Sequence, residues 1–122
     1  MGKKILIVDD DLQNLRFLEL ALTHTGYTVT SANNGQQAFE LFNRLNPDLV
    51  ITDMFMPRMN GIQLLKEIRK INQKIPVIGF TGAHFEHGDE EMDDLGFTTV
   101  LKKPVDTGHL KETIAKLLDN KK

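Results

Sequence analysis

Four short apolar segments of the chain each end in polar residues that could take part in chemistry. The polar groups, in chain order, are Asp9-Asp10-Asp11, Thr52-Asp53, Thr81 and Lys102-Lys103. They supply several carboxylates, a hydroxyl and ammonium groups. They can act together only if the fold brings the four segment ends to one place.

Such a cluster would be suited to handling a phosphoryl group. Carboxylates that lie close together repel one another, and a divalent cation removes the conflict. Oxygen ligands of this kind suit magnesium, which binds through one or two carboxylates and keeps several waters. A lysine and a threonine hydroxyl can hold phosphoryl oxygens, and a central carboxylate can serve as the nucleophile. The expected product is an aspartyl phosphate.

The apolar segments have the pattern of strands in a parallel sheet. Most are short continuous runs, which is typical of strands buried on both faces. The second alternates with threonines and is expected at a sheet edge. The expected strands are residues 5–8, 27–32, 49–51, 77–80 and 99–101.

Segments with helical spacing of apolar residues alternate with these strands. Their apolar positions are Leu15, Leu18 and Leu22, then Ala38, Leu41, Phe42 and Leu45, then Ile62, Leu65 and Ile68, and finally Leu110, Ile114, Leu117 and Leu118. An acidic helix with few apolar anchors is expected over residues 86–94. Asp11 and Asp106 are placed to cap the first and last helices.

Alternating strands and helices predict an α/β fold, an open doubly wound sandwich with parallel strands and right-handed crossovers. In such folds the site lies beyond the carboxyl ends of the strands. The polar groups follow the strands directly, so we expect them to converge at that edge.

The composition narrows the class of protein. The 122 residues fit one domain over 1–122. The net charge of -2 gives no sign of the excess positive charge that binds nucleic acid or anionic lipid. There are no cysteines, which excludes disulfides and thiolate sites. The first apolar run is too short for a signal peptide, and no run is long enough to span a membrane. We therefore expect a cytoplasmic domain.

Four motifs in order resemble the receiver domains of two-component response regulators over nearly the whole chain. They are Ile5-Leu6-Ile7-Val8-Asp9-Asp10-Asp11, Asp48-Leu49-Val50-Ile51-Thr52-Asp53-Met54-Phe55-Met56-Pro57 with Asn60-Gly61, Pro76-Val77-Ile78-Gly79-Phe80-Thr81-Gly82, and Leu101-Lys102-Lys103-Pro104. The resemblance implies a flavodoxin-like sheet of five strands in the order 2-1-3-4-5.

The resemblance also implies a role for each matching residue. Asp53 is the expected phosphoacceptor. Mg²⁺ (or Mn²⁺) is expected to bind Asp10 directly, Asp9 through water, and also Asp53 and the backbone carbonyl of Phe55. The family therefore implies a metal site made of residues from two of the motifs.

The switch residues implied by the family lie in the last two motifs. Thr81 is expected to donate its hydroxyl to the phosphoryl group and Lys103 to pair with it, with a cis bond before Pro104. Val100 stands where the family usually has an aromatic residue, so a rotating ring coupled to Thr81 is not expected.

The resemblance implies a signalling switch rather than an enzyme with an external substrate. A histidine kinase or phosphotransfer domain would donate the phosphoryl group. The switch would then alter a face around residues 86–94, strand 99–101 and the last helix, for a downstream protein or output domain. A magnesium-dependent phosphohydrolase is the alternative, but such enzymes generally carry a second carboxylate at the position of Phe55. A binding-only receiver would be expected to have lost Asp53, an acidic partner or Lys103.

Overall fold

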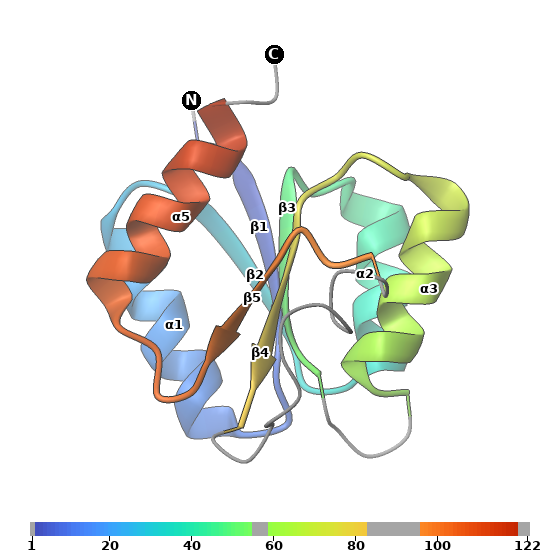
Figure 1. The fold of residues 1–122 in the computed structure, drawn as a ribbon, viewed down its shortest axis with the longest axis horizontal. Helices are drawn as coiled ribbons and strands as arrows, with labels where there is room; N and C mark the ends of the chain where they lie inside the picture. Colours follow the sequence, from blue (N-terminus) through green and yellow to red (C-terminus); the bar gives the residue numbers. More distant parts are fainter. Residues whose placement is uncertain (1, 55–58, 83–95, 120–122) are drawn as a thin grey trace.

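Five parallel strands form a single sheet in the order β2-β1-β3-β4-β5 (Figure 1). The computed structural model describes residues 2–54, 59–82 and 96–119. The strands are β1 (Lys4–Val8), β2 (Thr28–Ala32), β3 (Leu49–Asp53), β4 (Val77–Thr81) and β5 (Thr99–Lys102). The predicted sheet and its order are confirmed, with β2 at an edge.

Helices cover both faces of the sheet, as expected for a doubly wound fold. The described helices are α1 (Leu12–His24), α2 (Gly35–Leu45), α3 (Gly61–Ile71) and α5 (Thr107–Asp119). Figure 1 shows α1 and α5 on one face and α2 and α3 on the other. The acidic helix predicted over residues 86–94 falls outside the described residues.

The core is divided into two layers because successive side chains of a strand point to opposite faces. In β1, Ile5 and Ile7 join the layer beneath α1 and α5, whereas Leu6 and Val8 join the layer beneath α2 and α3. All four side chains are buried. The central strands are thus apolar on both faces, which explains their unbroken apolar runs.

Side-chain caps set where the helices begin. The Asp11 carboxylate accepts the backbone N–H groups of Gln13 and Asn14, and the Asp106 carboxylate accepts those of Gly108 and His109. Both predicted caps are confirmed. They start α1 and α5 directly after the strand ends that carry the polar residues.

The buried face of α3 differs in detail from the predicted one. Leu65 and Ile68 are fully buried as predicted, but Ile62 is only half-buried and Leu64 is fully buried beside them. Leu64, Leu65 and Ile68 all belong to the core layer shared with α2 and the sheet, and Ile62 packs at the margin of that layer. Among the described residues, no helix has both the length and the apolarity needed to cross a membrane.

Candidate functional site

The predicted polar residues meet at the carboxyl edge of the sheet. Asp53 and Thr81 are the last residues of β3 and β4, and Asp9 and Lys103 directly follow β1 and β5. All the strands run the same way, and β1, β3, β4 and β5 are neighbours in the sheet. The parallel topology therefore gathers residues from four separate parts of the chain.

Three carboxylates form the centre of this cluster. Oxygen atoms of Asp9, Asp10 and Asp53 all lie within 4.8 Å of one another. Asp9 is 1% exposed and Asp53 8%, whereas Asp10 is exposed. Partial burial and then the neighbouring charge of Asp9 raise the pKa of Asp10 above its usual value. Placing these acids together therefore has an electrostatic cost that a cation would relieve.

Lys103 supplies part of the compensating charge. Its Nζ donates to Asp53 Oδ2 at 2.8 Å and to Asp9 Oδ2 at 3.2 Å. Burial by itself lowers the pKa of Lys103, but the hydrogen bond that Lys103 donates to Asp53 and the charges of both carboxylates outweigh it, and the pKa is raised. The ammonium therefore stays charged and bridges two buried acids. Lys102 is exposed, in line with the choice of Lys103.

Asp9 is held by further donors that sequence reasoning did not find. The backbone N–H of Asp11 donates to Asp9 Oδ1 at 3.0 Å, and the side-chain amide of Asn14 donates to Asp9 Oδ2. Both donors come from the start of α1. Asn14 gave no signal in the sequence, because an amide in the first turn of a helix is usually solvated.

The backbone beside Asp53 is fixed by the start of α3. Asn60 and Gln63 form a reciprocal capping box there. The Gly61 N–H donates to the carbonyl of Met54 at 3.1 Å, and a Cβ on Gly61 would lie 2.2 Å from the carbonyl oxygen of Asp53. A side chain at position 61 would thus displace the backbone of Asp53, which explains the Asn-Gly pair after the third strand.

Thr81 and Lys103 are connected through the backbone. The Lys103 N–H donates to the carbonyl of Thr81 at 2.8 Å, and the Thr81 side chain is 3% exposed. Among the residues that the structure describes, the contact of the Thr81 hydroxyl is a long one of 3.5 Å, to the carbonyl of Gly82. The hydroxyl is therefore weakly held and can turn to another acceptor. The Lys103–Pro104 bond is cis, which confirms the expectation.

Val100 and Phe55 are the two remaining positions that were predicted to matter for the site. Val100 is half-buried in β5 and packs against the core layer beneath α2 and α3. The backbone carbonyl of Phe55, predicted as a metal ligand, lies outside the described residues.

The donor set fits a hard divalent cation. The three clustered carboxylates offer only oxygen atoms, and Asp10 is open to solvent, which suits an ion that keeps waters. Among the described residues of the cluster, the Lys103 ammonium pairs with two of these three acids, so negative charge remains for a cation to neutralise.

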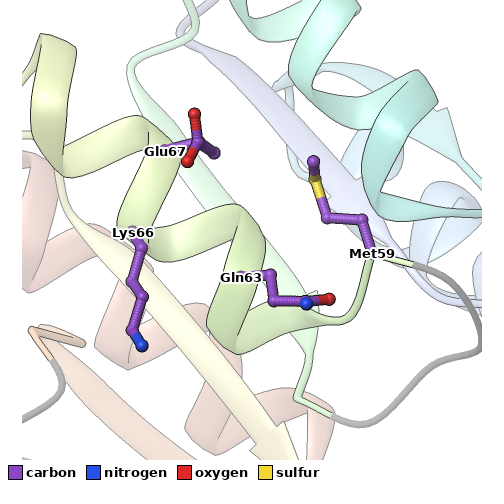
Figure 2. A pocket seen from close by; sticks show the side chains of 4 residues that line it. All are labelled: Met59, Gln63, Lys66 and Glu67. Atoms are coloured by element: carbon purple, nitrogen blue, oxygen red, sulfur yellow. The ribbon is translucent and has the colours of Figure 1, made fainter.

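The hollows on the described surface include one beside α1 and one beside α3. One, of about 350 Å³, runs between α1 and the chain after β5, and Asn14, Phe17, Lys103 and Pro104 are among its lining residues. The other, of about 490 Å³, is formed by Met59 just before α3 and by residues of that helix, Gln63, Lys66 and Glu67 (Figure 2). In the hollow beside α3, the Gln63 side chain is already part of the capping box and Glu67 pairs with Lys70.

The hollow beside α1 adjoins the carboxylate cluster.

Comparison with known proteins identifies the family of this chain. The family model described as "Response regulator receiver domain" matches residues 5–115. The chain belongs to this family. The receiver domain is therefore a signalling module of two-component systems.

Relatives of known name agree with this assignment. The receiver domain is 36% identical to sporulation initiation phosphotransferase F of Bacillus subtilis, covering 97% of this chain and 95% of that protein. It is 39% identical to the transcriptional regulatory protein ZraR of Escherichia coli over 93% of this chain, but spans only 26% of that protein. Relatives thus include both a receiver-sized protein and a much longer one.

A solved structure of similar sequence has the same fold. The receiver domain of a Francisella response regulator superposes with a TM-score of 0.92 at 30% identity, covering 99% of this chain and 100% of that one. The family assignment favours a switch over the phosphohydrolase alternative.

Proposed function

We propose that this receiver domain accepts a phosphoryl group on the carboxylate of Asp53 and thereby switches a protein-interaction surface. The observation that carries the proposal is the bridge from Lys103 Nζ to Asp53 and Asp9, with Asp10 beside them. The donor would be the phosphohistidine of a histidine kinase or of a phosphotransfer domain. An Asp53 oxygen attacks the phosphorus, the bond to the donor nitrogen breaks, and the imidazole leaves with that electron pair.

The residues that would hold Mg²⁺ (or Mn²⁺) are Asp9, Asp10, Asp53 and the backbone carbonyl of Phe55. When bound, the cation neutralises charge on the oxygens of the transferring phosphoryl group. Asp9 and Asp53 are buried and held in place by hydrogen bonds, so the chain presents these ligands already oriented.

Lys103 and Thr81 would respond to the new charge of roughly -1.5 to -2 on Asp53. The Lys103 ammonium, already on Asp53, moves to a phosphoryl oxygen, and the weakly held Thr81 hydroxyl turns to donate to another. The hydrogen bond from Lys103 N–H to the Thr81 carbonyl couples the two movements and passes them to β5. Because Val100 replaces the usual aromatic residue, the change is carried by the strand rather than by a rotating ring.

The surface that responds is proposed to include β5 and α5 together with residues 86–94, which lie outside the described residues. The partner there would be a downstream protein or an output domain. In this proposal residues 1–122 form one receiver domain that acts in the cytoplasm. It binds neither nucleic acid nor membrane directly, and it assists only its own phosphorylation and dephosphorylation.

The test is intact mass after incubation with acetyl phosphate and Mg²⁺. We expect one phosphoryl adduct on the parent and none when Mg²⁺ is omitted or in the variant Asp53→Asn. Asp11→Asn is the matched control, since asparagine also caps a helix and Asp11 lies outside the carboxylate cluster. It should keep the adduct. An adduct on Asp53→Asn would mean that another residue is the nucleophile, and none on the folded parent would contradict the proposal.

A further inference from the structure

Asn14 contacts the carboxylate cluster although it has no part in the proposed phosphotransfer. It lies in the first turn of α1, and its side-chain amide donates to Asp9 Oδ2. The same oxygen accepts from Lys103 Nζ at 3.2 Å. Asp9 Oδ2 thus has one neutral donor from a helix and one charged donor from the chain after β5.

Asp9 depends on protein donors because solvent hardly reaches it. Its side chain is 1% exposed, and its other oxygen accepts the backbone N–H of Asp11 at 3.0 Å. A buried carboxylate oxygen that lost its donors would be left unsatisfied. The orientation of Asp9 is therefore set by whichever donors remain on its two oxygens.

The two donors on Asp9 Oδ2 differ in how firmly they are placed. Lys103 is shared with Asp53, where its contact is shorter at 2.8 Å. In the proposed switch it leaves toward a phosphoryl oxygen. Asn14 belongs to a helix whose cap, Asp11, also accepts the backbone N–H of Asn14 at 3.4 Å. Asn14 can therefore stay on Asp9 when Lys103 moves.

We propose that Asn14 is a positioning residue, which holds the Asp9 carboxylate in the orientation that binds the divalent cation. The inference rests on the proposed function, because the cation site is part of it. A neutral amide holds the carboxylate without competing for its charge, whereas an ammonium on the same oxygen opposes the binding of a cation. Hydrogen-bond partners of metal-ligating groups fix their orientation, and losing one typically weakens metal binding 10–100-fold.

The test compares Mg²⁺ binding to the parent, Asn14→Leu and Gln13→Leu by calorimetry without any phosphodonor. Leucine at position 14 fills a similar volume and keeps water from replacing the amide. We expect the dissociation constant to rise about tenfold in Asn14→Leu. It should be unchanged in Gln13→Leu, because Gln13 is an exposed residue of the same turn. Asn14→Ala serves as a second variant if leucine prevents folding.

A second measurement separates positioning from a structural role. In Asn14→Leu the Mg²⁺ concentration that gives half-maximal phosphorylation by acetyl phosphate should rise by the same factor, with the maximal rate retained at saturating Mg²⁺. Equal Mg²⁺ affinity of parent and Asn14→Leu would overturn the inference, and so would equal weakening by Gln13→Leu. A parent that binds no Mg²⁺ would instead contradict the proposed function itself.

Discussion

At the scale of single residues, Lys103 stabilises the acidic cluster by compensating the charge of two buried carboxylates. Its ammonium contacts Asp9 and Asp53, both buried, and its own side chain is 30% exposed. Removing one partner of such a group leaves charge buried without compensation, which is more costly than the pairing itself is favourable. The raised pKa of Lys103 means that its stabilisation is fully present at neutral pH. It is lost only as the pH rises through that raised value.

Lys103→Met should lower the free energy of unfolding by about 2 kcal/mol at pH 7 without metal. This is less than the ~3–5 kcal/mol lost when a fully buried ion pair is broken, because water screens part of the charge of Lys103. Urea denaturation measures the change. The matched control is Lys102→Met, which alters an exposed lysine and should stay within about 0.5 kcal/mol. Equal effects of the two substitutions would mean that the bridge contributes no stability.

At the scale of elements, α3 is joined to the strands by the side chain of Arg69. Its Nε and Nη2 donate to the carbonyl of Gly96 at 3.1 and 2.9 Å, and its Nη1 donates to that of Ile75 at 2.7 Å. Gly96 precedes β5 and Ile75 precedes β4. One guanidinium therefore connects the end of α3 to the starts of β4, which ends at Thr81, and β5, which Lys103 directly follows.

Arg69→Met keeps most of the aliphatic stem and removes these donors, so we expect the unfolding free energy to fall by about 2–3 kcal/mol. Amide hydrogen exchange should also quicken at Thr98, whose N–H donates to the carbonyl of Val77 beside this junction. The neighbour Lys70 pairs with Glu67 at the surface, and Lys70→Met should change stability by less than about 0.5 kcal/mol. Unchanged stability and exchange in Arg69→Met would show that the junction holds without the guanidinium.

At the scale of the whole molecule, folding concentrates negative charge at one edge of the sheet. The net charge is only -2, yet three carboxylates meet at the ends of β1 and β3. The unfolded chain separates Asp53 from Asp9 and Asp10 and so relieves its repulsion with them. A divalent cation bound to them should therefore stabilise the folded form over the unfolded one.

Mg²⁺ at ten times its dissociation constant should add about 1.4 kcal/mol to stability and raise the melting temperature by roughly 5 °C. Differential scanning calorimetry measures the shift, with sodium chloride of equal ionic strength as the control for screening. Chelation of the metal should reverse it, and Asp10→Asn should largely abolish it. A shift of the same size with sodium chloride would point to screening rather than to a bound ion.

Much of the fold and of the candidate site could be predicted because the deciding signals are local. Continuous apolar runs such as Leu49–Ile51 indicate buried parallel strands, and Asp11 and Asp106 mark helix starts by hydrogen bonds within one turn. The convergence of Asp9, Asp53 and Lys103 followed from the rule that parallel strands end at one edge. The order of the strands came from the family resemblance, since periodicity does not say which strands are neighbours.

The tertiary structure decided what depends on contacts between distant parts of the chain. Lys103 and Asp9 are 94 residues apart, and only the folded sheet shows that the ammonium reaches both Asp9 and Asp53. The hydrogen bonds from the Asn14 amide to Asp9 and from the Arg69 guanidinium to Gly96 could likewise not be predicted from the sequence. A polar side chain on a helix can point to solvent or to a partner with the same local pattern. Only the packing of that helix against the sheet selects between the two.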